Sequence, residues 1–268
     1  MRIRALALAA SGAVALSAFA VPAAQAAPAA PVGPAVTFSK VKVNAGKNIV
    51  VGTTGKLTVT ATYTVTKPAS LSASSFQSGP AFYRGTTLDL EGNSFGGDNP
   101  GTCTTVSSTV LNCTAKVEFR PASSDDTEDL TNADAGTWKL GALAVGSNGG
   151  ITTQTGFGTS NVQRQAQLTV NAAPEPVKKG KTITVTGKLS RANWDTSKYA
   201  GYAAQPVQLQ FKKNGSTTYT TVKTVKTSST GGLSTTVKAG VDGSYRYTFA
   251  GTTTTPAVSA AGDFVDVK

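Results

Sequence analysis

The chain has 268 residues, with 25 Lys or Arg, 14 Asp or Glu and no His. Without histidine, catalysis by a nucleophile paired with a histidine base is excluded, and no side chain has an ordinary pKa suited to proton transfer at neutral pH. Small and β-branched residues are plentiful and only 7% of residues are aromatic, a composition typical of short strands joined by many turns. We therefore expect a scaffold or binding protein rather than an enzyme.

The first 26 residues have the features of a secretory signal peptide. Arg2 and Arg4 supply a positive start, an apolar run extends from Ala5 to Ala20, and Ala24-Gln25-Ala26 supplies a small-x-small cleavage site. The run is shorter than a membrane-spanning helix requires. We expect cleavage after Ala26 and a secreted, extracellular mature chain without a membrane span.

Strand patterns begin after the Pro/Ala-rich residues 27–36. Residues 37–43 alternate in part, and residues 56–66 alternate clearly, with apolar side chains on one face and mainly threonines on the other, as in a half-buried strand. Residues 27–172 are therefore expected to form a first β-domain. Its further strands are expected around Phe82 and at residues 88–90, 115–119, 138–145 and 165–170.

The chain has two cysteines, Cys103 and Cys113. The segment between them has the pattern of a hairpin that turns near residues 107–109, which would place the two side chains opposite each other. Outside the cytoplasm an even cysteine count favours a disulfide. Closing so short a loop contributes about 2.7 kcal/mol in the chain-entropy estimate.

Pro174 and Pro176 mark a short, stiff linker, and we place a second domain at residues 173–268. Asn214-Gly215 is a strong hairpin signal, because both residue types tolerate positive φ. The strands expected in this domain are 182–189, 206–213, 218–225, 233–238, 244–249 and 263–267.

Two short patterns occur once in each half of the chain. Gly55-Lys56-Leu57-Thr58-Val59-Thr60-Ala61 is matched by Gly180-Lys181-Thr182-Ile183-Thr184-Val185-Thr186, and Asp134-Ala135-Gly136-Thr137-Trp138 by Asp242-Gly243-Ser244-Tyr245. This repetition, together with the strand patterns, predicts an all-β protein of two tandem antiparallel β-sandwiches, and its Gly-x-aromatic corners resemble those of immunoglobulin-like β-sandwich domains. Tyr245 is expected to pack inward with its hydroxyl bonded to backbone, and Trp138 to take the same place with its indole N–H.

The second domain carries a family resemblance. Gln205-Pro206-Val207-Gln208-Leu209-Gln210-Phe211, then Thr230-Gly231-Gly232-Leu233, then the segment from Gly243 to Gly251 resemble bacterial immunoglobulin-like modules of secreted actinobacterial proteins. The resemblance covers about residues 176–268 and is looser in the first domain. It implies adhesion, spacing or ligand presentation, and it brings no catalytic residues.

Charge is distributed unevenly between the two predicted domains. Residues 27–172 hold 10 Lys or Arg and 9 Asp or Glu, a net charge of +1, whereas residues 173–268 hold 13 and 5, a net charge of +8. A basic second domain favours contact with cell-wall polysaccharide or another extracellular polyanion. The alternative is a charged surface that only keeps the protein soluble. No motif indicates specific recognition of nucleic acid.

Two segments are candidate sites. The first is an acidic cluster that would suit a calcium ion, whose preferred ligands are oxygens; the alternative is a solvated loop, and no other cofactor is expected. Its residues are Asp125, Asp126, Glu128, Asp129 and Asp134. The second is a long loop at residues 190–202, whose aromatic rings would stack on sugars while its cations meet anionic groups. Its ligand-binding candidates are Arg191, Trp194, Lys198, Tyr199 and Tyr202. The alternative for this loop is a lid of aromatic side chains over one end of the core.

Taken together, these features predict a secreted, non-enzymatic adhesion or binding protein at or near the cell surface, with the second domain as the contact surface. The alternatives are a purely structural extracellular scaffold and a calcium-dependent module built on residues 125–134.

Overall fold

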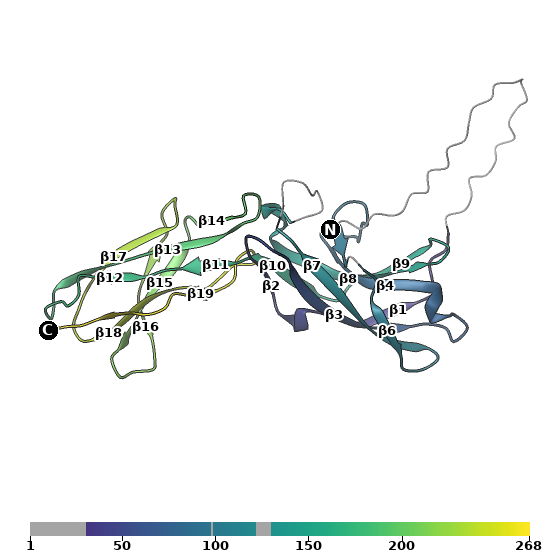
Figure 1. Ribbon diagram of the computed structural model, residues 1–268, viewed down its shortest axis with the longest axis horizontal. Coiled ribbons are helices and arrows are strands. Elements are labelled where there is room, and N and C mark those ends of the chain that lie inside the picture. The colour runs from purple at the N-terminus through teal and green to yellow at the C-terminus, as the bar shows by residue number, and fades with distance from the viewer. Residues whose placement is uncertain (1–30, 98, 122–129) are drawn as a thin grey trace, which may run out of the picture. The chain divides into compact units, whose positions relative to one another are not determined.

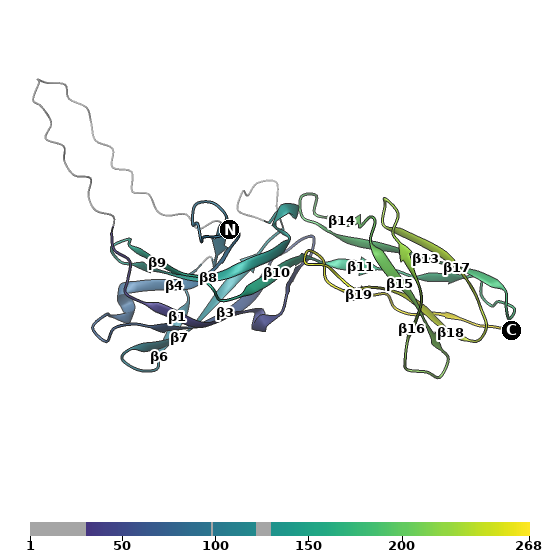
Figure 2. The same ribbon diagram turned by 180° about the vertical axis from the view of Figure 1, so that it is seen from behind.

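A computed structural model describes residues 31–97, 99–121 and 130–268. The expected all-β class is confirmed: these residues form strands β1 to β20 and three short 3-10 turns, η1 (Asn44–Gly46), η2 (Ala73–Ser75) and η3 (Asn132–Asp134) (Figure 1, and from behind in Figure 2). Across the described ranges, no helix is long and apolar enough to cross a membrane. The signal peptide predicted at residues 1–26 lies outside the described residues.

The chain divides into two compact units whose ranges interleave along the sequence. Of the residues described, the first unit comprises residues 31–45, Val59–Val117 and Lys139–Thr159. The second unit comprises Gly46–Thr58, Glu118–Trp138 and Ser160–Lys268. The domain boundary expected between residues 172 and 173 stays a prediction.

The first unit contains two antiparallel sheets. One has the strand order β1-β3-β7-β6, and in the other β4 pairs with β5 and β8, and β8 with β9. The strands of the first sheet are β1 (Thr37–Val43), β3 (Leu57–Thr66), β7 (Val110–Phe119) and β6 (Thr102–Thr105). Those of the second are β4 (Phe76–Tyr83), β5 (Ser94–Gly96), β8 (Gly136–Gly146) and β9 (Ile151–Gln154).

Strand β3 illustrates how alternation builds the first unit. Val59, Ala61, Tyr63 and Val65 are buried and the residues between them are not, so the predicted half-buried strand is confirmed. The Tyr63 hydroxyl donates to the Ser78 carbonyl oxygen of β4 at 2.8 Å. This bond ties the two sheets together, and burial raises the pKa of Tyr63.

The cysteine hairpin is formed by β6 and β7. Cys103 and Cys113 are directly opposite each other and joined by a disulfide. The Val106 amide donates to the Val110 carbonyl oxygen at 2.9 Å across the turn. The predicted hairpin and disulfide are therefore confirmed.

The second unit contains two sheets that face each other, and it also holds a parallel strand pair. In one sheet β13 pairs with β11, β12, β14 and β17; the other has the order β16-β15-β18-β19, with β20 also on β18. The parallel pair is β2 (Ile49–Val51) with β10 (Thr159–Arg164). The first sheet comprises β11 (Ala166–Leu168), β12 (Asn171–Ala173), β13 (Thr182–Asn193), β14 (Lys198–Gly201) and β17 (Gly232–Lys238). The second comprises β15 (Pro206–Lys213), β16 (Thr220–Lys226), β18 (Gly243–Phe249), β19 (Val258–Ser259) and β20 (Asp263–Val265).

The core of the second unit lies between these two sheets. Ile183, Val185 and Leu189 of β13 meet Leu209 of β15 and Tyr247 of β18 in one buried cluster. Each strand contributes alternate residues, which is the pattern expected of a sandwich. The Tyr247 hydroxyl donates to the Val185 carbonyl oxygen at 2.8 Å and so links the two sheets.

That bond corrects one expectation about the aromatic corners. Tyr245 is buried as predicted, but its ring packs on Phe211 with 4.7 Å between centroids. The hydroxyl bond to backbone is made two residues later, by Tyr247. In the other copy of the pattern, Trp138 donates its indole N–H to the Asp134 carbonyl oxygen at 2.8 Å, as predicted.

The repeated Gly-Lys pattern has a clear structural basis. Gly55 and Gly180 precede β3 and β13 and have φ of +73° and +79°. Residues other than glycine rarely adopt this conformation. In both copies, therefore, a left-handed glycine leads the chain into a half-buried strand.

Two expectations about local structure are wrong, and a third is confirmed with shifted bounds. Residues 88–90 form no strand, because Asp89 forms a turn in which its carboxylate accepts the Glu91 amide at 3.0 Å. Residues 165–170 do not close the first sandwich, since β11 within them pairs with β13. The Asn214-Gly215 hairpin exists, but only Gly215 has positive φ, and β16 does not begin until Thr220.

Candidate functional site

The segment predicted to be a long loop at residues 190–202 is a β-hairpin. It consists of the end of β13, a turn at residues 194–197 and the short strand β14. In its register Arg191 lies opposite Ala200, and Asn193 opposite Lys198. Because successive strand residues face opposite sides of a sheet, Arg191 lies on the other side from Ala192.

Trp194 is fully buried, with 0% of its surface exposed. Its indole N–H points to the Val51 carbonyl oxygen at 3.4 Å, and the neighbouring Ala192 carbonyl oxygen accepts the Arg164 Nε–H at 2.5 Å. The prediction that Trp194 is a ligand-stacking ring is wrong, because no face of the ring is open to solvent. The alternative, an aromatic side chain that covers one end of the core, matches its burial.

Asn132 of η3 is hydrogen-bonded to the turn that contains Trp194. Its side-chain Nδ2 donates to Asn193 Oδ1 at 2.7 Å and also to Asp195, and its Oδ1 accepts the Trp194 amide at 3.0 Å. The Asn132 amide donates to Asp195 Oδ1 at 2.9 Å. The two candidate segments of the sequence therefore meet at this point in the second unit, through Asn132 on one side and Asn193, Trp194 and the Asp195 carboxylate on the other.

Arg191 and Tyr202 form a stacked pair on the side of the hairpin opposite to Ala192. The Arg191 guanidinium carbon lies 3.8 Å from the centroid of the Tyr202 ring. One of its terminal nitrogens donates to Thr254 Oγ1 at 3.2 Å and to Thr255 Oγ1 at 3.1 Å. Partial burial lowers the pKa of Arg191. The donors of this Arg191 nitrogen are therefore directed to hydroxyl groups within the protein.

The remaining residues of this candidate site differ in whether their polar groups are free to bind a ligand. The Tyr199 hydroxyl donates to Gln165 Oε1 at 2.6 Å, whereas Lys198 is exposed. Arg164 lies beneath the hairpin, and burial together with repulsion from Arg191 lowers its pKa to about 10. Of the five predicted ligand-binding residues, Lys198 is therefore the one that combines exposure with freedom from hydrogen bonds in the described structure.

Of the acidic candidate site, the structure describes Asp134. Asp125, Asp126, Glu128 and Asp129 lie outside the described residues. Asp134 is described, and its carboxylate accepts the Thr131 amide at 2.7 Å and the Thr131 hydroxyl at 2.8 Å, which caps η3. The described ranges contain no cluster of three or more candidate metal ligands, and the calcium site stays a prediction.

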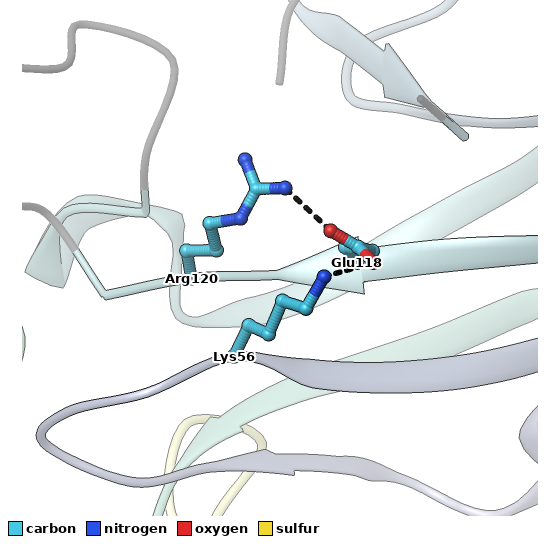
Figure 3. A network of polar contacts seen from close by, with 3 residues as sticks. All are labelled: Lys56, Glu118 and Arg120. Carbon is cyan, nitrogen blue, oxygen red and sulfur yellow. Dashed lines mark hydrogen bonds and ion pairs between the residues drawn. The ribbon is translucent and has the colours of Figure 1, made fainter. Parts of the chain in front are cut away.

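Two cations in the earlier part of the chain, Lys56 and Arg120, share one acidic partner. Glu118, at the end of β7, accepts Lys56 Nζ at 2.7 Å on one carboxylate oxygen and contacts Arg120 with the other (Figure 3). Hydrogen bonds from Lys56 and then from Arg120 lower the pKa of Glu118. Lys56 belongs to the repeated Gly-Lys pattern. Its counterpart Lys181 is exposed and has no ion pair within the described chain.

A second stacked cation, which was not predicted from the sequence, lies on the outer face of the sheet that contains β15 and β18. The Arg246 guanidinium carbon lies 3.7 Å from the centroid of the Tyr219 ring, and Lys212 Nζ lies 5.1 Å from it. Alternation in the segments 206–213 and 244–249 indicates which residues face outward. It does not indicate that Tyr219, from the connection between β15 and β16, lies over that face.

Comparison with known proteins identifies no family. No family model matches the chain, and no curated protein matches it. The resemblance to actinobacterial modules therefore stays an interpretation of residues 176–268.

Several solved structures are similar at low identity. Dimeric latent PorU from Porphyromonas gingivalis is 10% identical with a TM-score of 0.28; the match covers 87% of this chain and 20% of the PorU chain, so this chain spans about a fifth of that length. The tandem Ig repeats of Dlar are 10% identical with a TM-score of 0.23, covering 88% of this chain and 99% of theirs. Dpr2 Ig1-Ig2, solved in complex with DIP-Theta Ig1-Ig3, is 14% identical with a TM-score of 0.27 and the same two coverages.

Proposed function

We propose that this is a secreted, non-enzymatic binding or adhesion protein that acts at or near the cell surface. Its partner is an extracellular polyanion, for which an acidic cell-wall polysaccharide is the leading candidate. The contact is made by the basic part of the second unit, residues 173–268.

The observation that supports this proposal is the number of cations without an acidic partner. Residues 173–268 are all described and contain 13 Lys or Arg. Among them one ion pair is found, between Lys268 and Asp266 at 3.8 Å, which leaves 13 − 1 = 12 cations unpaired. Unpaired surface cations create a positive potential that attracts polyanions and is screened by salt.

The burial of Trp194 determines which surface is proposed for the contact. A buried indole cannot stack on a sugar ring, and Arg191 already has two threonine partners. The contact is therefore assigned to exposed lysines and to the outer faces of the sheets, rather than to the hairpin at residues 190–202. The structural-scaffold alternative predicts no saturable binding to any polymer.

The test is binding of the secreted chain to immobilised polygalacturonate or dextran sulfate, with neutral dextran as the control polymer. Binding to the two anionic polymers should be saturable at about 50 mM NaCl and weaken by at least about tenfold at about 500 mM. Absence of binding to both anionic polymers, or equal binding to neutral dextran, would overturn the proposal.

A matched pair of double variants locates the contact. Lys178→Gln with Lys179→Gln removes two exposed cations from the basic region, and Lys40→Gln with Lys42→Gln removes two exposed cations from the first unit. The first double variant should weaken binding several-fold and the second should have less than about a twofold effect. Equal losses would mean that only the total charge matters and that the second unit is not the contact surface.

A further inference from the structure

The outer face of the sheet formed by β15 and β18 is polar and ordered by register. Gln210 lies opposite Arg246, and Lys212 opposite Ser244. Because their neighbours Leu209, Tyr245 and Tyr247 are buried in the core, these four side chains lie on the outward side. A glutamine, an arginine and a lysine are thus gathered on one flat surface.

Tyr219 lies across this surface and positions the two cations. Arg246 stacks on its ring at 3.7 Å and Lys212 lies 5.1 Å from the ring centroid. The far end of the ring reaches Gly262, where a Cβ atom would stand 2.2 Å from the Tyr219 hydroxyl oxygen. Gly262 therefore provides the space in which the ring is seated.

Arg246 is held in place with part of its binding capacity unused. Its Nε–H donates to Gln210 Oε1 at 2.9 Å, and the stack on Tyr219 fixes the plane of the guanidinium. Within the described chain, neither terminal nitrogen of Arg246 makes a hydrogen bond, and neither Arg246 nor Lys212 has a carboxylate partner. A planar guanidinium with both terminal nitrogens free matches the two oxygens of a carboxylate, sulfate or phosphate group.

We propose that Arg246, seated on Tyr219 and oriented by Gln210, binds an acidic group of an extracellular polysaccharide in a bidentate manner, with Lys212 as the second cation. This inference rests on the proposed function and names its binding site. Preorganisation by Tyr219 and Gln210 lowers the entropy lost when the guanidinium is immobilised. A uronate carboxylate and a sulfate ester share the required pair of oxygens, so both are candidate groups.

Arg191 is a natural control for this argument. It also stacks on a tyrosine, at 3.8 Å, but it donates to two threonine hydroxyls in the same unit. Stacking alone therefore does not define the site. The free terminal nitrogens and the outward position distinguish Arg246 from Arg191.

The test compares Arg246→Lys with Lys238→Gln for binding to polygalacturonate and to dextran sulfate. Arg246→Lys keeps the charge but loses the planar pair of donors, and it should weaken binding to the preferred polymer by about tenfold. Lys238→Gln removes a charge from an exposed position at the end of β17 and should change affinity by less than about twofold. Polygalacturonate as the preferred polymer identifies a carboxylate site, and dextran sulfate identifies a sulfate site.

Two further variants test the support of Arg246. Tyr219→Phe keeps the ring and should retain most of the affinity, whereas Tyr219→Ala should lose about as much as Arg246→Lys. Thermal melts establish that each variant is folded. Wild-type affinity in Arg246→Lys would overturn this inference and leave the proposed function standing. Failure of the wild-type chain to bind either polymer would overturn both.

Discussion

The second unit contains two arginine–tyrosine stacks with nearly the same geometry and different surroundings. Arg191 lies 3.8 Å from the Tyr202 ring and Arg246 lies 3.7 Å from the Tyr219 ring. Arg191 is desolvated and bonded to Thr254 and Thr255, whereas Arg246 lies on an outer sheet face and has one protein acceptor.

The difference shows that a stacked cation is not by itself a sign of binding. A cation–π contact stabilises a fold as readily as it orients a recognition group. What separates the two is the hydrogen-bonding capacity that the protein itself leaves unused. On this criterion we interpret the Arg191 hairpin as structural and propose the Arg246 face as the surface for a ligand.

The largest test of this distinction is Trp194→Ala, which removes the buried support of the Arg191 hairpin. Loss of a fully buried tryptophan should lower the free energy of unfolding by about 3–5 kcal/mol, because it combines lost burial with a cavity. Urea unfolding followed by circular dichroism measures the change.

Two comparisons make that result decisive. Lys198→Ala, at an exposed position of the same hairpin, should alter the free energy of unfolding by no more than about 0.5 kcal/mol. Trp194→Phe keeps much of the buried ring and should lose less stability than Trp194→Ala. If Trp194→Ala had the wild-type urea midpoint and bound the anionic polymers less well, the hairpin would be the ligand surface after all.

A smaller loss is expected from Asn132→Ala. The side chain of Asn132 accepts the Trp194 amide at 3.0 Å and donates to Asn193 at 2.7 Å. Removing it leaves these polar groups without their partner, which costs about 1–3 kcal/mol. Differential scanning calorimetry at pH 7 should record a lower Tm.

Thr196→Ala serves as the control for Asn132→Ala, since Thr196 is exposed in the same turn. It should leave Tm nearly unchanged. Equal Tm values for Asn132→Ala and the wild-type chain would show that the contacts around the Trp194 turn carry no stability.

The sequence predicts the strands of this protein better than it predicts the candidate sites. The bounds of β1 and β15 agree with the expected segments, and the disulfide follows from the hairpin pattern between Cys103 and Cys113. These features depend on local alternation and turn chemistry, which are written in neighbouring residues. The short strands β2, β9 and β12 were not expected, because three or four residues give too little periodicity.

The candidate sites depend on contacts between distant segments. Trp194 is buried because Val51, 143 residues away in sequence, lies against its indole. Tyr219 meets Arg246 because β16 returns beside β15, which pairs with β18. The sequence marks Trp194 as a candidate and does not mark Tyr219, and only the packing decides which of these two aromatic residues is core and which one faces outward.

The smallest test separates the two faces of β18, where Tyr247 points inward and Arg246 outward. Tyr247→Phe removes the hydroxyl that donates to the Val185 carbonyl oxygen at 2.8 Å and should lower the free energy of unfolding by about 1 kcal/mol at pH 7.

The same variant tests the pH dependence of stability. Burial raises the pKa of Tyr247 from 10.0 to about 12, so the folded state favours the neutral phenol. Its contribution is therefore fully present below pH 10 and is lost as pH rises towards about 12. In urea titrations across that range, the variant should lose stability less steeply than the wild-type chain. Tyr63 and Tyr245 also have raised pKa values, so the free energy of unfolding should still fall with pH in both chains.

Binding serves as the control for this variant. Affinity of Tyr247→Phe for the anionic polymers at pH 7 should not change. A Tyr247→Phe chain that is stable but binds several-fold more weakly would contradict the assignment of the two faces, because the inner face would then contribute to the ligand surface.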